Sequence, residues 1–98
     1  MQAGMVRQVS KPDKRTVWYV YILRCADRTL YTGVTTDVDR RVKEHNEHAS
    51  KGAKYTRTRR PVTLVYQEPQ QTRSDACKRE WAIKKMTRSQ KECLLDEN

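Results

Sequence analysis

The chain has 98 residues and a formal net charge of +9, and only 36% of its residues are apolar. This length supports one domain with a small core, and no apolar run approaches the ~20 residues that a membrane-spanning helix needs. The N-terminus shows no signal peptide, and the three cysteines form no CxxC or Cys/His cluster, which argues against a zinc site or a disulfide framework. We therefore expect reduced thiols and a cytoplasmic protein without membrane contact.

The positive charge is concentrated in two segments. Residues 1–16 carry a net charge of +3 and residues 51–61 carry +5, whereas residues 17–50 are neutral overall and residues 62–98 carry +1. A local excess of this kind attracts polyanions and releases their counterions. A surface that only keeps the protein soluble explains the composition equally well.

The first segment differs from the rest of the chain. Residues 1–15 lack apolar periodicity and contain Gly4, Pro12 and four basic side chains, so we expect a disordered basic arm. Residues 16–98 are expected to form the single folded domain.

Two runs rich in aromatic and β-branched residues predict a hairpin, with strands at 17–25 and 30–35. Register decides which side chains share a face of the sheet. A two-residue turn would place Tyr21 and Tyr31 on opposite faces, whereas a loop of odd length or a bulge would place them on the same face. If the two tyrosines act together, the connection must be of the odd kind. Gly33 marks a bulge, a close approach of a ligand, or only a strand position that needs no side chain.

A helix is expected over residues 37–49, with Thr36 as its N-cap and Asp39 as the partner in a capping box. His45 falls on the apolar stripe of this helix, and Arg41 borders the stripe one turn earlier. The apolar members of the stripe are Val38, Val42 and Ala49.

Residues 50–61 are expected to form a basic loop that contacts nucleic acid, with a solvated surface as the alternative. The candidate contact residues are Lys51, Lys54, Tyr55, Arg57, Arg59 and Arg60.

A third strand at 62–67 and a second helix at 73–86, capped by Thr72, follow the loop. Ser89 and Glu92 form a capping box that predicts a short last helix. The element order β-β-α-β-α-α indicates an α+β fold in which helices flank a small three-stranded antiparallel sheet.

Several side chains with polar groups lie at strand positions or on helix stripes that usually hold apolar packing residues. A tyrosine in a strand is usually a packing residue, and a histidine on an apolar stripe is more often a buried group with one hydrogen bond. Arg41 lies one turn before His45, so both side chains can reach one spot. Glu80 lies on the apolar stripe of the second helix, where a carboxylate must be paired or bind a metal. A buried ion pair with Arg41 is the structural alternative to a magnesium ligand.

These groups together fit the hydrolysis of a phosphodiester. A guanidinium matches phosphate oxygens, an imidazole accepts or relays a proton, and a metal stabilises the departing alkoxide. Tyrosine is a weak base at its usual pKa of about 10. We expect Arg41, the basic loop and a metal to favour the tyrosinate form, which then accepts a proton near pH 7.

The order of these motifs resembles that of the GIY-YIG endonuclease family, and of its small stand-alone bacterial branch in particular. The matching positions are Trp18-Tyr19-Val20-Tyr21, Leu30-Tyr31-Thr32-Gly33, Arg41, His45 and Glu80, and the resemblance covers about residues 17–95. It implies that Tyr21 and Tyr31 lie near the scissile phosphate and that one of them is the general base. It also implies that Arg41 binds phosphate and that His45 hydrogen-bonds within the site. Glu80 would bind a single divalent ion, Mg²⁺ or Mn²⁺.

The chain departs from the family pattern in two places. The first motif lacks its leading glycine, and the asparagine that many members carry one to two turns after the glutamate is absent, with Gln90 as the candidate substitute. A DNA-recognition domain is not evident in the sequence. The resemblance therefore implies shape-guided or weakly specific cleavage, or dependence on a partner protein.

The leading hypothesis is a magnesium-dependent endonuclease, a monomer that acts on branched, flapped or duplex DNA in repair, recombination or related processing, with RNA left open as a substrate. The alternative is a non-catalytic nucleic-acid-binding module that keeps the fold. A third interpretation, a protein-interaction domain with an incidental basic surface, predicts no salt-dependent binding of nucleic acid.

Overall fold

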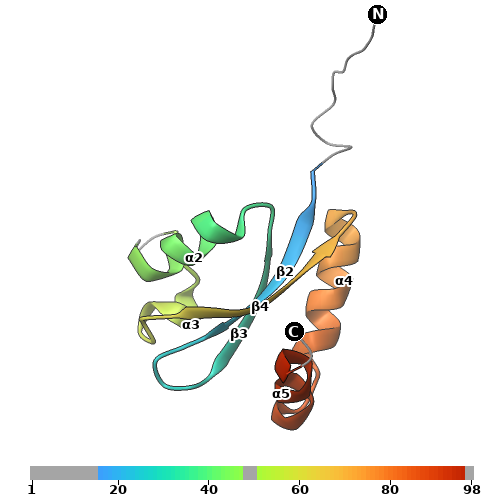
Figure 1. Cartoon of the computed structure of the whole chain (residues 1–98). Coiled ribbons are helices and arrows are strands. Elements are labelled where there is room, and N and C mark those ends of the chain that lie inside the picture. The colour runs from blue at the N-terminus through green and yellow to red at the C-terminus, as the bar shows by residue number, and fades with distance from the viewer. Residues whose placement is uncertain (1–15, 48–50, 97–98) are drawn as a thin grey trace, which may run out of the picture.

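The computed structural model describes residues 16–47 and 51–96 (Figure 1). The expected basic arm at residues 1–15 and Ala49 of the helical stripe lie outside the described residues. The elements are β2 (Trp18–Arg24), β3 (Leu30–Thr35), α2 (Val38–Glu47), α3 (Lys54–Arg57), β4 (Thr63–Gln70), α4 (Arg73–Lys84) and α5 (Arg88–Asp96). None of the described helices is both long and apolar enough to cross a lipid bilayer.

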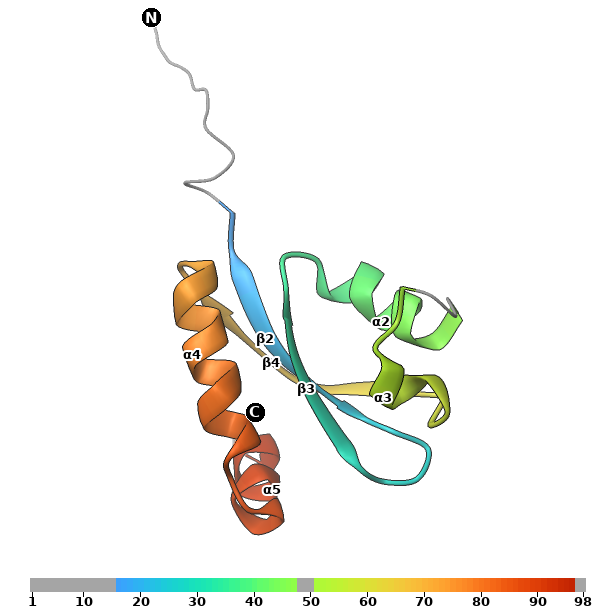
Figure 2. The ribbon, with the colours of Figure 1, turned by 180° about the vertical axis from the view of Figure 1, so that it is seen from behind.

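The strands form one antiparallel sheet in the order β3-β2-β4. Helices α2 and α3 lie on one side of this sheet and helices α4 and α5 lie on the other (Figures 1 and 2). The expected α+β fold with a three-stranded antiparallel sheet is confirmed.

The central strand β2 supplies both halves of the core. Successive side chains of a strand point to opposite faces, so Val20 and Ile22 pack against α4, whereas Tyr21 and Leu23 belong to a second cluster on the α2 side. All four side chains are buried. Burial on both faces explains why this run reads as continuously apolar and aromatic, without polar alternation.

The register of the hairpin places both motif tyrosines on one face. Tyr21 pairs with Gly33, and Leu23 pairs with Tyr31. The last pair is Arg24 with Leu30, so five residues form the connection between the strands. The connection is therefore of the odd kind, and Tyr21 and Tyr31 both face α2.

Within the segment expected as a loop, residues 51–61 contain more regular structure than expected. One helical turn, α3, occupies Lys54–Arg57 inside the expected loop. Strand β4 also continues to Gln70, beyond the expected end at residue 67, and passes through Pro69. A proline is tolerated there because β4 is an edge strand, which uses only one of its sides for ladder hydrogen bonds.

The N-cap of α2 lies one residue later than expected. Asp37, not Thr36, is the cap, because its Oδ1 accepts a hydrogen bond from the backbone N–H of Arg40 at 3.1 Å. Thr35 supports the same turn by accepting from the N–H of Asp37 at 3.1 Å. Threonine and aspartate are both good N-caps, so the sequence could not choose between neighbours.

The cap of α4 is confirmed and that of α5 is corrected. Thr72 accepts a hydrogen bond from the N–H of Asp75, as expected. Helix α5 is capped by Thr87, whose Oγ1 accepts from the N–H of Gln90 at 3.1 Å, and not by Ser89.

Candidate active site

The site begins where the ring of Tyr21 crosses β3. A Cβ atom added to Gly33 would lie 2.5 Å from the Tyr21 hydroxyl oxygen and 2.7 Å from its Cζ. Gly33 therefore makes room for the tyrosine ring. It does not mark a bulge, since the register shift of the sheet lies between Ile22 and Leu23, on the side of β4.

His45 of α2 is the side chain that meets both motif tyrosines. It is 0% exposed, and its Nε2 lies 2.9 Å from the hydroxyl of Tyr21. Its ring makes edge contacts with Tyr21 and Tyr31, with centroids 6.0 Å and 5.2 Å away. The two tyrosine rings are themselves 6.4 Å apart. The hairpin and α2 thus bring three of the expected site residues into contact.

The protonation pattern of His45 follows from its neighbours. The backbone N–H of Ala53 can only donate, and it lies 3.3 Å from Nδ1 of His45. The amide of Ala53 thus favours Nδ1 as an acceptor and a ring proton on Nε2, beside the oxygen of Tyr21. Thr56, also 0% exposed, places its hydroxyl 2.8 Å from the same Nδ1. The hydroxyl of Thr56 also donates to the carbonyl of Ala53 at 3.0 Å, so Ala53 and Thr56, which the sequence analysis missed, together enclose Nδ1 of His45.

Burial dominates the electrostatics of this pair. It lowers the pKa of His45 to about 4, with the positive charge of Arg41 acting in the same direction, so the imidazole is neutral at pH 7. Burial, followed by the neighbouring Tyr31, raises the pKa of Tyr21 to about 12, although a hydrogen bond from Arg41 opposes the rise. The expected effect of Arg41 is not met at Tyr21, because desolvation outweighs the arginine, and the part of the expectation that rests on a metal stays a prediction.

Arg41 lies at the rim of the site with a side chain that is 25% exposed. Its Nη1 donates to Oε1 of Glu44 at 3.0 Å and to the carbonyl of Lys51, and, against the effect of burial, Glu44 and the nearby Tyr21 raise the pKa of the guanidinium. These contacts fix its position beside Tyr21 while leaving part of the group open to an incoming anion.

Glu80 belongs to the opposite layer, because α4 covers the other face of the sheet. Its negative charge contributes to the raised pKa of Tyr21, so the carboxylate lies within electrostatic reach of that hydroxyl. Its ion-pair partner is Lys84, at 3.2 Å, and its side chain is 22% exposed. The structural alternative, a buried pair of Glu80 with Arg41, is not what the structure shows.

The donor set for a metal is small. Among residues 16–47 and 51–96, no group of three His, Cys, Asp or Glu side chains is placed to hold a metal ion. Glu80 offers one partly exposed carboxylate. A single carboxylate suits Mg²⁺, which keeps several waters and takes phosphate oxygens from its substrate.

An aromatic column continues from the site to the surface. The ring of Tyr55 in α3 stacks on Tyr31, with centroids 5.9 Å apart and planes inclined by 26°. The guanidinium carbon of Arg59 lies 4.0 Å from the centroid of Tyr55. Tyr55 is 38% exposed, so one end of the column is open to solvent.

The candidate contact residues of the basic segment fall into two groups. Arg59 pairs with Asp27 at 2.9 Å and donates to the carbonyl of Tyr55 at 2.7 Å, while Arg60 donates to the carbonyl of His45 at 2.6 Å. These two arginines hold α3 against the site. The exposed side chains of the segment that remain are Lys51, Lys54, Tyr55 and Arg57.

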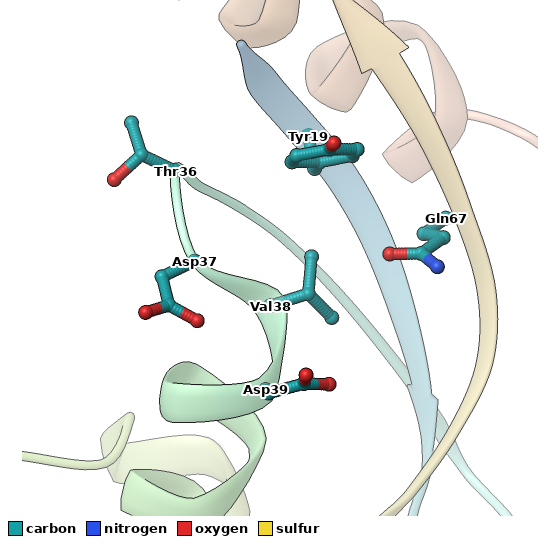
Figure 3. A pocket seen from close by; sticks show the side chains of 6 residues that line it. All are labelled: Tyr19, Thr36, Asp37, Val38, Asp39 and Gln67. Carbon is teal, nitrogen blue, oxygen red and sulfur yellow. The ribbon is translucent and has the colours of Figure 1, made fainter. Parts of the chain in front are cut away.

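A cavity of about 250 Å³ opens beside the site at the start of α2. The carboxylate of Asp39 and the amide of Gln67 point towards each other across it (Figure 3). Gln67 is the cross-strand partner of Tyr21, so both lie on the same face of the sheet. The cavity contains no basic side chain, and a nucleic-acid backbone would be repelled from this end of the site and attracted to the α3 end.

A family model described as the GIY-YIG catalytic domain matches residues 17–92. The chain belongs to the GIY-YIG family. It is 53% identical to the UPF0213 protein of Desulfotalea psychrophila over 89% of this chain and 79% of that protein. It is 58% identical to a UPF0213 protein of Haloquadratum walsbyi, over 81% of this chain and 86% of that protein.

Solved structures agree with the GIY-YIG assignment. The solution NMR structure of the UPF0213 protein of Bacillus halodurans is 45% identical and superposes with a TM-score of 0.55, covering 84% of this chain and 85% of that one. A protein from E. faecalis gives a TM-score of 0.57 at 43% identity, with 86% and 88% covered. The sequence-based assignment to the small stand-alone members of the GIY-YIG family is confirmed.

The structure shows what Gln90, the candidate substitute for the missing asparagine, does in this chain. The Oε1 of Gln90 accepts a hydrogen bond from the N–H of Thr87 at 2.9 Å, and the N–H of Gln90 donates to Thr87 in return. The Gln90 side chain is thus part of the capping box of α5 and does not take the place of the missing asparagine.

Proposed function

We propose that this GIY-YIG protein is a metal-dependent endonuclease that hydrolyses phosphodiester bonds in DNA. The observation that carries the proposal is the buried contact between the hydroxyl of Tyr21 and Nε2 of His45, at 2.9 Å, beside the positive charge of Arg41. A buried tyrosine that serves only packing needs one partner. A phenolic oxygen that contacts an imidazole and lies beside a guanidinium charge is suited to negative charge that forms during a reaction.

The roles follow from exposure and hydrogen bonding. Arg41 binds the scissile phosphate, because its partly open guanidinium offers the planar fork that phosphate oxygens accept. Tyr21 keeps its proton at rest, since its pKa is about 12, and it positions the phosphate or the attacking water. Tyr31 is half-buried and has no hydrogen bond to a described residue, so its hydroxyl is the better candidate for the general base. His45 is a positioning residue that acts through Tyr21.

Glu80 is the residue that would hold the divalent ion, Mg²⁺ or Mn²⁺. A bound ion would supply positive charge next to the leaving oxygen. Its binding must compete with Lys84, whose ammonium now neutralises the carboxylate.

The substrate follows from the charged surfaces. Lys54 and Arg57 contact the backbone without reading sequence, which favours shape-guided or weakly specific cleavage of branched, flapped or duplex DNA. We place this activity in the cytoplasm, in DNA repair, recombination or related processing, with the protein acting as a monomer or with a partner that supplies specificity. Cleavage of RNA in place of DNA would change the substrate and leave the site assignment intact.

The test is incubation with branched, flapped, single-stranded and duplex DNA in Mg²⁺, Mn²⁺ or chelator. We expect metal-dependent cleavage that Glu80→Gln abolishes while DNA binding stays near normal, since the change removes charge and keeps size. Arg41→Ala should weaken both binding and cleavage, and Tyr31→Phe should lower only the rate. Lys84→Ala is the matched control, because it frees Glu80 and should retain or increase metal-dependent cleavage.

The non-catalytic module remains the second candidate because of two observations. Glu80 is paired with Lys84, and the side chain of Gln90 is engaged in a helix cap. DNA binding by the wild type without cleavage of any substrate, in either metal, would favour this module. Equal cleavage by the wild type and Glu80→Gln would instead refute only the metal role of Glu80.

A further inference from the structure

Three arginines line one cavity on the face of the sheet opposite Tyr21. The cavity measures about 310 Å³ and is lined by Arg24, Arg28 and Arg88. Arg24 ends β2, Arg28 lies in the turn between β2 and β3, and Arg88 begins α5. Because Arg24 follows Leu23 in the strand, it lies on the α4 and α5 side, so this cavity is separate from the tyrosine site.

The cavity has more positive than negative charge. Glu92 is the carboxylate bound to this group, and it pairs with Arg88 at 2.7 Å and with Arg24 at 3.2 Å. The hydrogen bond from Arg88, together with Arg24, holds the pKa of Glu92 below its usual range. Three guanidinium groups against one carboxylate leave two positive charges in excess. Arg28 has no ion pair or hydrogen bond of its side chain among the described residues.

The backbone at Arg28 is unusual for an arginine. Its φ is 71°, in the left-handed region that glycine and asparagine occupy more readily. The turn is fixed by a hydrogen bond from the N–H of Arg28 to the carbonyl of Cys25 and by another from Cys25 to Thr29, both at 2.9 Å. An arginine in this conformation is strained relative to glycine, and its side chain is directed from a rigid turn.

The turn is also joined to the basic segment around α3. The N–H of Ala26 donates to the carbonyl of Arg59 at 2.9 Å, and Arg59 pairs with Asp27 at 2.9 Å. Figures 1 and 2 both show α3 beside this end of the hairpin. The exposed cations Lys54 and Arg57 and the turn that carries Arg28 are therefore held in one connected part of the fold.

We propose that Arg24, Arg28 and Arg88 form a second phosphate-binding site, which holds the nucleic-acid backbone away from the scissile phosphate. The inference rests on the proposed function for its choice of polyanion. A guanidinium cluster of this kind takes phosphate oxygens through paired N–H donors, and Arg28 is the member free to do so. The site lengthens the contact with DNA beyond the bonds near Tyr21 and contributes affinity without sequence preference.

The first experiment measures duplex binding by the full chain in chelator, over a series of salt concentrations and duplex lengths. Arg28→Gly removes the side chain and suits the positive φ, so the turn is kept. We expect affinity for long duplexes to fall about 10-fold and the salt slope to fall by about 0.9, the value for one phosphate contact. Binding of the shortest duplexes should be unchanged. Arg28→Lys should recover part of the affinity, because it keeps the charge and loses the fork.

Lys78→Ala is the charge-matched control, since Lys78 is an exposed cation of α4 outside this cavity. An unchanged affinity and salt slope in Arg28→Gly, or an equal loss in Lys78→Ala, would overturn the proposal.

The second experiment titrates inorganic phosphate while the Nε–Hε signals of the arginines are followed by NMR. We expect the signals of Arg24, Arg28 and Arg88 to shift together in the wild type and not in Arg28→Gly. Phosphate binding without any effect of Arg28→Gly on DNA affinity would overturn the nucleic-acid assignment. If the wild type cleaves no DNA, the proposed nuclease activity is refuted. The two binding measurements still test the phosphate site, because neither of them depends on cleavage.

Discussion

At the scale of single residues, burial decides the chemistry of the site more than charge does. The sequence identifies Arg41, and its positive charge alone predicts a lowered tyrosine pKa. The 1% exposure of Tyr21 is not visible in the sequence, and desolvation moves its pKa in the other direction, to about 12. The proton on Tyr21 and the neutral state of His45 are therefore properties of the packed fold.

Thr56 supports the first residue-scale prediction. Thr56→Val keeps the shape of the side chain and removes the hydroxyl that lies 2.8 Å from Nδ1 of His45. We expect a loss of ~1–2 kcal/mol in the free energy of unfolding. Because His45 then holds Tyr21 less firmly, the single-turnover cleavage rate should fall about 10-fold while DNA affinity is unchanged.

The controls for Thr56 are a conservative variant and a spectrum. Thr56→Ser should restore the rate, and the ¹⁵N shifts of the wild-type imidazole should show a proton on Nε2 and none on Nδ1. A proton on Nδ1 would contradict the tautomer that the amide of Ala53 imposes.

At the scale of elements, the sequence succeeds where apolar periodicity is long. It predicts β3 at residues 30–35 and the start of α4 at residue 73, both as observed. It misses α3, because four residues of helix in a run of basic side chains have no apolar period to read. That turn carries Thr56 and Tyr55, so the part of the site that fixes His45 was also missed.

The order within the α3 segment supports a prediction about its cations. Replacing Lys54 and Arg57 with Ala should weaken DNA binding about 10-fold and reduce the salt slope by about 1.8, since each phosphate contact contributes about 0.9. Arg59→Ala should act differently, because Arg59 pairs with Asp27 and lies over Tyr55. We expect it to lower stability by ~0.5–1 kcal/mol and to change the slope little.

Fluorescence anisotropy between 50 and 200 mM salt, with thermal melts of the same variants, separates these effects. If the double variant binds DNA with wild-type affinity, Lys54 and Arg57 belong to a solvated surface that does not contact DNA. An equal slope change in Arg59→Ala would show that its ion pair opens to bind phosphate.

At the scale of the whole molecule, the expected site residues come from both layers of the fold. Tyr21, Tyr31 and His45 come from the hairpin and α2, and Glu80 comes from α4 on the other face. The sequence predicts these residues because their motifs are ordered along the chain. It could not predict the cluster of Arg24, Arg28 and Arg88, which spans more than sixty positions and follows no motif.

The acid stability of the molecule gives the last prediction. The pKa of His45 is about 4 in the folded protein and 6.5 in the unfolded chain. Between these two pH values the unfolded chain binds a proton at His45 and the folded protein does not. Stability should therefore be full above pH 6.5 and fall by ~2–3 kcal/mol as the pH drops to 4. Tyr21, with a folded pKa of about 12 against 10, should cause a second loss as the pH rises through that range.

Urea unfolding followed by circular dichroism between pH 4 and 8 measures the acid limb. His45→Gln removes the titrating group and keeps a polar side chain, so this variant should be less stable at pH 7 and should lose less stability on acidification. Ion-pair and hydrogen-bond partners hold the pKa values of Glu44, Glu68 and Glu92 below the usual range of a glutamate. If the free energy of unfolding falls equally with decreasing pH in the wild type and in His45→Gln, His45 is not a buried neutral group. The arrangement of Tyr21 would then not depend on it.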